Sequence, residues 1–149
     1  MISLIVVDAW KNCEKEDLIQ FPWLEYETKL FGKYLNLHLT LIKEKFDIDI
    51  YYIDSGRAIM DEIDTTNGTI VNDISNIEEK YDYYYFCGFH LGRCINKKLL
   101  ELNNNNSGIV INLSLIFPSD TYKKNSKINS TANYMYSYEK GFECIDMKI

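Results

Sequence analysis

The segment Gly88–Ile95 joins a strand-like aromatic run, Tyr81–Cys87, to a helix-like run, Asn96–Asn103, and it carries Cys94. A cysteine at a strand-to-helix corner lies at a helix N-terminus, where the dipole and free backbone N–H groups favour a thiolate and can bind an oxyanion. The corner also lies at the carboxyl end of a strand, where open α/β sheets bind ligands. The sequence therefore predicts a candidate nucleophile here, although Cys94 could instead be a small apolar residue packed at a helix start.

A nearly continuous apolar run at the start of the chain, Ile2–Asp8, is rich in β-branched residues. This pattern is typical of a central parallel strand that is covered on both faces. Asp8 would then emerge at the carboxyl end of that strand. Four further runs are strand-like: Asp49–Ile53, Thr69–Val71, Tyr81–Cys87 and Ile109–Phe117.

Helical periodicity is clearest over Phe31–Phe46, where apolar residues recur every three or four positions. His38 lies in that apolar stripe, so we interpret it as a packed residue. We also expect one or two helical turns over Ala58–Ile63 and a short helix over Ser75–Glu79, with Ser75 as N-cap. The order of elements favours a Rossmann-like, three-layer α/β/α sandwich on a mostly parallel sheet.

The 149 residues are expected to form one domain, because 46% of them are apolar and this length suits a single core. A polar stretch at about 118–133 predicts a long loop. After it, Tyr134–Ile145 alternates aromatic and polar residues, which predicts a strand pair or an edge strand.

Charge and composition exclude several classes of function. The net charge of −6 and the absence of a basic cluster argue against a nucleic-acid partner. No apolar run reaches membrane-spanning length, and the first residues do not resemble a signal peptide. We therefore expect a cytoplasmic protein that does not bind membranes.

The cysteines and histidines are not spaced as metal ligands. Four cysteines without a secretory signal indicate free thiols in a reducing compartment. No pair of them has zinc-site spacing, and the two histidines stand alone in the sequence, so we expect no metal and no cofactor. The four cysteines are Cys13, Cys87, Cys94 and Cys144, and the two histidines are His38 and His90.

Two stretches together resemble the isochorismatase-like cysteine hydrolases, the superfamily that includes nicotinamidases. Leu4–Asn12 is similar to the family's first strand, which ends in an aspartate and is soon followed by polar residues. Gly88–Ile95 is similar to its nucleophile loop, with a glycine that ends a strand, a cysteine six residues later and then an aliphatic residue.

The resemblance implies roles for particular residues. Cys94 would be the nucleophile, Asp8 the general base, and the N–H groups of Leu91 and Cys94 the oxyanion donors. A cis peptide bond, frequent in the family's loop, would fall at His90–Leu91. Side chains placed to line a substrate pocket are Trp10, His90 and Arg57.

Several positions depart from the family pattern. The catalytic lysine expected just after the third strand is replaced by Asn72 and Asp73, and Asp73 would add like charge near Asp8. Arg57 or Lys80 would have to supply the missing cation. The nucleophile loop is also bulkier than usual, and the metal-binding histidines of nicotinamidases are missing.

Three functions remain open on the sequence alone. The first is a cysteine hydrolase that acts on a small amide or a related small molecule. The second is a catalytically inactive pseudoenzyme that serves in binding or assembly, in which Tyr81–Tyr85 and Tyr134–Tyr138 would pair edges of a homo-oligomer. The third, phosphotransfer of the haloacid-dehalogenase type, is disfavoured because Trp10 stands where a second aspartate is needed.

Overall fold

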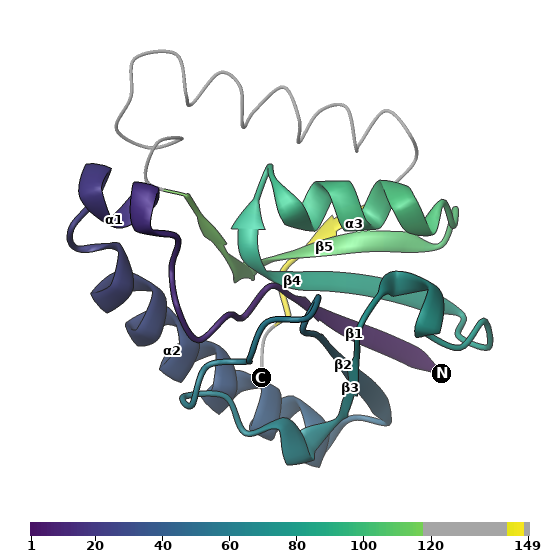
Figure 1. The fold of residues 1–149 in the computed structure, drawn as a ribbon. Coiled ribbons are helices and arrows are strands. Elements are labelled where there is room, and N and C mark those ends of the chain that lie inside the picture. The colour runs from purple at the N-terminus through teal and green to yellow at the C-terminus, as the bar shows by residue number, and fades with distance from the viewer. Residues whose placement is uncertain (118–142, 148–149) are drawn as a thin grey trace.

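A six-stranded parallel sheet forms the centre of the computed structural model, which describes residues 1–117 and 143–147 (Figure 1). The strand order is β3-β2-β1-β4-β5-β6, and every neighbouring pair is parallel. The order reverses between β1 and β4, which is where open α/β sheets place their ligands. The strands are β1 (Ile2–Val7), β2 (Ile48–Ile53), β3 (Thr69–Val71), β4 (Tyr83–Leu91), β5 (Ser107–Ile116) and β6 (Glu143–Ile145).

Helices cover both faces of the sheet. Figure 1 shows α2 on one face and α3 on the other, which makes the predicted three-layer α/β/α arrangement. Alternate residues of β1 separate accordingly: Leu4 packs in the core under α2, and Ile5 packs in the core under α3. The helices are α1 (Lys15–Gln20), α2 (Leu24–Lys45) and α3 (Cys94–Leu102), with one-turn 3-10 helices η1 (Thr65–Asn67) and η2 (Ile74–Asn76).

Helix α2 is longer than its sequence periodicity predicts, because it begins at Leu24 rather than at Phe31. Pro22 lies just before the helix, where a missing N–H group and a fixed φ angle are tolerated. The buried side chains of α2 recur at helical spacing along one face. Acidic residues lie in the first turn of the helix and basic residues in the last, as the helix dipole favours.

Two predicted helical segments fold differently. The residues Ala58–Ile63 form an antiparallel bridge from Ile59 to Trp10 followed by a turn. The Met60 N–H donates to the carbonyl of Ala9, and the Lys11 N–H donates to that of Ala58. The backbone N–H of Met60 and the carbonyl of Ala58 bond to the segment after β1, so they are not available for the hydrogen bonds within a helix. The predicted helix at Ser75–Glu79 is the single 3-10 turn η2, which is preceded by Asp73.

The tyrosine-rich run before and within β4 is part of the core. Tyr81, Tyr84 and Tyr85 are buried, and β4 is a central strand between β1 and β5. Sheet packing therefore accounts for these three side chains, and a central strand has no free edge to pair. That the protein forms a homo-oligomer stays a prediction. Tyr134–Tyr138 and the predicted loop at 118–133 lie outside the described residues.

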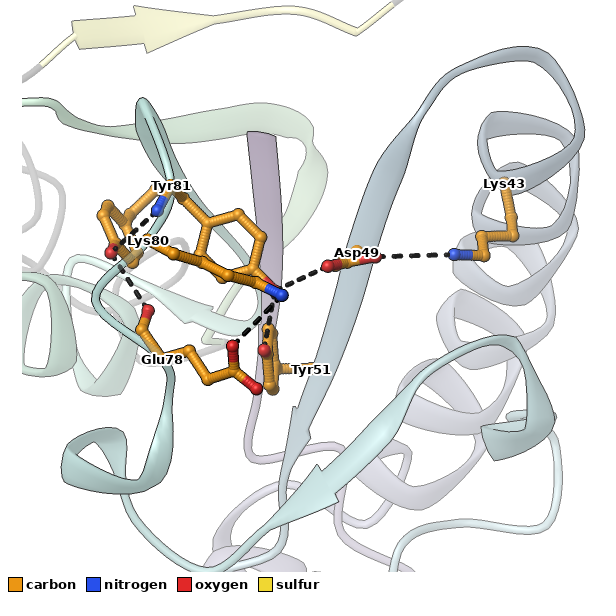
Figure 2. A network of polar contacts seen from close by, with 7 residues as sticks. Lys43, Asp49, Tyr51, Glu78, Lys80 and Tyr81 are labelled. Atoms are coloured by element: carbon orange, nitrogen blue, oxygen red, sulfur yellow. Dashed lines mark hydrogen bonds and ion pairs between the residues drawn. The ribbon is translucent and has the colours of Figure 1, made fainter. Parts of the chain in front are cut away.

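A polar network joins strands at the amino-terminal edge of the sheet (Figure 2). The Tyr81 hydroxyl donates to Asp49 at 2.6 Å, and the Tyr51 hydroxyl lies 2.6 Å from that of Tyr81. Lys43 of α2 lies 3.9 Å from Asp49 and donates to the carbonyl of Ile48. The network therefore ties α2, β2 and the segment before β4 together.

Within residues 1–117 and 143–147, none of the helices combines the length and apolar composition that a membrane crossing needs.

Candidate active site

Asp8 is the first residue beyond β1 and adopts an unusual backbone conformation. Its φ is 52°, in the left-handed region, which is strained for most side chains but tolerated by aspartate at a cost of order 1 kcal/mol. The side chain is buried, with 8% exposed. The carboxylate is thus turned away from the direction of the strand and held at the switch point between β1 and β4.

Strand β4 runs to Leu91, four residues past the predicted end at Cys87. Gly88 makes this possible: its φ is 106°, and a Cβ there would lie 2.7 Å from the carbonyl oxygen of Val7. Only a glycine lets β4 pass this close to β1 at that point.

The cis peptide bond lies one residue earlier than predicted, at Phe89–His90 rather than at His90–Leu91. Strand β4 has register irregularities between Phe86 and Gly88 and between Phe89 and Leu91. The family pattern, carried over residue by residue, therefore misplaces the bond by one residue in this irregular strand.

Cys94 is the first residue of α3, and its side chain is partly exposed rather than sealed in packing. The Asp8 carboxylate lies close enough to the thiol to raise its pKa, and both side chains line one cavity. The corner that presents Cys94 is held by the Gly92 N–H, which donates to the Asn96 side chain at 2.7 Å. The structure therefore brings together the predicted nucleophile and the predicted base.

The thiol of Cys94 differs from the sequence-based expectation of a favoured thiolate. Burial, followed by the nearby Asp8 carboxylate, raises its pKa to about 11. Lys97 and Lys98 act in the opposite direction without reversing the effect. At neutral pH the sulfur is protonated in the free protein, because desolvation outweighs the advantage of the helix N-terminus.

Burial also raises the pKa of Asp8 above its usual value. The neighbouring Cys94 thiol and the positive charges of Lys98, Arg57 and Lys97 oppose this effect. Oδ1 of Asp8 is buried and has no hydrogen-bond partner among the described residues. A carboxylate with a raised pKa and an unpaired oxygen is suited to accept a proton.

A cavity of about 160 Å³ opens at this edge of the sheet, and both Asp8 and Cys94 line it. Its aromatic wall is closed by Phe117, whose ring lies 5.0 Å from that of His90 and 5.8 Å from that of Phe21. The Arg93 guanidinium lies 4.4 Å from the Phe117 ring centroid. Lining residues include Asp8, Trp10, Phe89, His90, Cys94 and Phe117.

The predicted pocket residues are only partly brought together. Trp10 and His90 line the cavity, whereas Arg57 is not part of its lining. The Arg57 guanidinium stacks 3.9 Å from the centre of the Trp10 ring and pairs with Glu14. Leu91 does not line the cavity but pairs with β5. Its role as an oxyanion donor stays a prediction.

Comparisons with known proteins identify the architecture. A pyrazinamidase of Pyrococcus horikoshii, solved in complex with zinc, aligns with a TM-score of 0.62 and 12% identity over 98% of this chain and 99% of that one. An isochorismatase-like hydrolase from Alkaliphilus metalliredigens aligns with a TM-score of 0.65 and 10% identity over 97% and 94%. The chain has an isochorismatase-like fold. No protein-family model matches the sequence, and no curated protein matches it either.

On this isochorismatase-like fold, the cation near the acid and the thiol comes from an element that the sequence analysis overlooked. Lys98 of α3 has a side chain only 17% exposed, and its ammonium lies 3.3 Å from Glu101 and 3.8 Å from Asp73. Its charge lowers the pKa of both Asp8 and Cys94. Asp73 is therefore paired with a lysine rather than acting as a like charge. The signal was available, because Lys98 stands four residues after Cys94, on the same side of the helix.

The other proposed source of that cation, Lys80, lies elsewhere. It pairs with Glu78 at 3.1 Å in the network at the opposite edge of the sheet (Figure 2).

The donor set of the cavity does not suit a metal ion. Among the described residues, no three histidine, cysteine, aspartate or glutamate side chains are grouped closely enough to hold one.

Proposed function

We propose that this protein hydrolyses a small primary amide through a thioester formed on Cys94. The observation that supports the proposal best is that the Cys94 thiol and the Asp8 carboxylate line one cavity at the switch point of the sheet, close enough for each to shift the pKa of the other. A nucleophile beside a positioned base is the arrangement that covalent hydrolysis requires.

The reaction balances with these two side chains and one water. Asp8 takes the thiol proton as the sulfur of Cys94 attacks the amide carbon, and the carbonyl oxygen becomes an oxyanion. The C–N bond then breaks, and Asp8 delivers the proton to the departing nitrogen as ammonia leaves. A water, deprotonated by Asp8, attacks the thioester and releases a carboxylic acid and the free thiol.

The raised pKa values fit this order of events. Because the pKa of Cys94 is about 11, the sulfur must lose its proton during the attack rather than before it. Burial raises the pKa of Asp8, which strengthens the carboxylate as the acceptor of that proton. The backbone N–H groups of Cys94 and Leu91 are the proposed oxyanion donors.

Two unpaired polar atoms support an amide as the substrate. Oδ1 of Asp8 is a buried acceptor, and Nε1 of Trp10 is a buried donor, and neither has a hydrogen-bond partner among the described residues. Both residues line the cavity. A primary amide offers the matching groups, an N–H donor and a carbonyl acceptor, so its binding would relieve two unsatisfied buried groups.

The size and walls of the cavity favour a flat acyl group. A dry cavity of about 150 Å³ is known to hold one benzene ring. The 160 Å³ here, walled by Phe89, His90 and Phe117, has room for one six-membered ring. Pyrazinamide is such a ring amide and is therefore a suitable first test compound.

Lys98 takes the place of the family lysine in this proposal. It approaches from α3, beside Asp73, instead of from the segment after β3. Its charge stabilises the anionic forms of both Asp8 and Cys94. We expect the reaction to occur in the cytoplasm, where the free thiol of Cys94 stays reduced.

The decisive experiment measures ammonia release from a panel of small primary amides, pyrazinamide among them, with intact protein mass recorded after an acid quench. We expect ammonia above the Cys94→Ala background and an acyl adduct that maps to Cys94 rather than to Cys13. Absence of both for every amide, or an adduct on Cys13 alone, would overturn the proposal.

The alternative is a pseudoenzyme that binds small molecules without turning them over. It is favoured by the raised pKa of Cys94 and by Asn72 and Asp73 at the family lysine position. In that case ring amides would raise the melting temperature, and the Cys94→Ala variant would respond as the unmodified protein does, with no ammonia in either.

A further inference from the structure

Helix α2 carries a continuous apolar stripe on the face that points away from the sheet. The sheet-facing side of the helix is buried, whereas these side chains are exposed, Tyr26 by 74% and Leu37 by 58%. They recur at intervals of three or four residues, so they share one side of the helix. The α2 stripe consists of Trp23, Tyr26, Leu30, Tyr34 and Leu37.

The side chains of the α2 stripe are exposed, so packing in the core of this chain does not explain why they are apolar. Single exposed apolar residues are ordinary, but five in one row form a contiguous patch, which marks an interaction surface. Helix α2 lies on the outside of the three-layer fold (Figure 1), so the stripe is accessible along most of the helix.

The spacing of the stripe is self-complementary in one orientation. When a second α2 lies antiparallel across it, with a two-fold axis between Lys33 and Tyr34, Leu30 faces Leu37 of the second copy. Tyr26 then faces Leu41, a half-buried residue on the same side of the helix. The same two contacts recur on the other side of the axis. A parallel alignment would instead place each residue against itself. An isologous two-fold pairing of this kind forms a closed dimer.

The charges at the ends of α2 favour the same orientation. Glu25 and Glu27 lie in the first turn, and Lys45 lies in the last. Lys43, also in the last turn, is held within the chain by Asp49 and the Ile48 carbonyl. Antiparallel pairing brings the acidic end of one helix to the basic end of the other and opposes the two helix dipoles. Parallel pairing would place like charges together at both ends.

We propose that the protein forms a two-fold homodimer through antiparallel contact of the α2 stripes. The interface is a single helix pair, so the dimer is a weak one, with a dissociation constant in roughly the micromolar range. This inference does not depend on the hydrolase proposal, because Asp8 and Cys94 lie at the carboxyl edge of the sheet and not on α2.

The first test is sedimentation velocity between about 1 and 300 µM, a range chosen to span weak association. We expect a shift from monomer to dimer for the unmodified protein and monomer throughout for Leu30→Glu and Leu37→Glu. Ile70→Glu is the matched control: Ile70 is also 50% exposed, but it lies on β3, and this variant should dimerise normally. Circular dichroism checks that each variant is folded.

The second test fixes the orientation with a short bismaleimide cross-linker. Tyr34→Cys, beside the axis, should cross-link to itself, and Tyr26→Cys should cross-link only when mixed with Leu41→Cys. The unmodified protein gives the background from native thiols. A monomer at every concentration, a dimer that survives both glutamate variants, or self-cross-linking of Tyr26→Cys would overturn the proposal.

Discussion

The two edges of the sheet differ in how their polar side chains are paired, although the buried Ser107 hydroxyl at the amino edge is also without a hydrogen-bond partner among the described residues. At the amino edge, the hydroxyls of Tyr51 and Tyr81 and the carboxylate of Asp49 bond to one another within 2.6 Å contacts (Figure 2). At the carboxyl edge, Oδ1 of Asp8 and Nε1 of Trp10 are buried without hydrogen-bond partners in the described part of the chain. Paired groups stabilise a fold, whereas unpaired ones are costly to keep and are typical of a site that receives a ligand.

The largest effect is expected for Asp8→Asn, which should reduce ammonia release by at least about a thousandfold, because the base is lost. Iodoacetamide labelling of Cys94 at pH 8 should change in the opposite direction and become faster, since the Asp8 charge that raises the thiol pKa is gone. Turnover assays and peptide mapping of the label measure the two effects.

The control for Asp8→Asn is Asp54→Asn. Asp54 also follows a strand at the carboxyl edge, but its carboxylate accepts from the Gly56 N–H and does not line the cavity. Both readouts should be unaffected. If turnover and labelling fall together in Asp8→Asn, the assignment of Asp8 as the base of a protonated thiol is wrong.

Gly88→Ala tests the close approach of β4 to β1 that carries the site. The new Cβ would meet the Val7 carbonyl at 2.7 Å with φ at 106°, so we expect a loss of about 3 kcal/mol in the free energy of unfolding. Gly56→Ala has a similar φ of 81° but open space, and should lose only about 1–2 kcal/mol. Urea denaturation compares them, and equal losses would contradict the packing argument.

Tyr81→Phe disrupts the polar network at the amino-terminal edge of the sheet. Removing its hydroxyl leaves Asp49 and Tyr51 without their shared partner, which should reduce the free energy of unfolding by about 1–3 kcal/mol. Tyr83→Phe, at a position 39% exposed, should have an effect close to zero. Thermal unfolding of both variants provides the measurement; a neutral Tyr81→Phe would show that the network does not stabilise the fold.

Asp8→Asn should stabilise the protein at neutral pH, the reverse of Tyr81→Phe. Burial raises the folded-state pKa of Asp8 above its unfolded value near 4, so the wild-type protein loses stability as pH rises through that interval. Asparagine also tolerates the left-handed φ. We expect a gain of about 1 kcal/mol at pH 7 that disappears below about pH 4. A gain that is constant with pH would exclude the titration of Asp8 as its cause.

The smallest effect is expected for Lys98→Met. Without this charge the pKa of both Asp8 and Cys94 should increase, so the acidic limb of the kcat/KM profile should move to higher pH. Turnover at pH 7 should decrease about two- to tenfold. Lys45→Met, at the exposed end of α2, should leave the profile in place. A drop in turnover with no shift in the profile would indicate a merely structural role.

Much of the fold could be predicted because local patterns decide it. The apolar Ile2–Val7 run required a strand covered on both faces, and the periodicity from Phe31 required an amphipathic helix. The family resemblance placed Asp8 and Cys94 at two strand ends, and the parallel topology then brought them to one edge. The segment Ala58–Ile63 could not be predicted, because it is fixed by hydrogen bonds to residues fifty positions earlier in the chain, around Ala9.

The sequence by itself identified Asp8 and Cys94 as the candidate residues and placed them at the carboxyl edge of the sheet, because residue type and strand ends can be recognised from local patterns. Only the tertiary structure decided the protonation state of Cys94, the stacking of Arg57 on the Trp10 ring and the position of Lys98 beside Asp73. Desolvation and Coulomb interactions depend on distances between elements far apart in the chain, and no spacing along a sequence specifies those distances.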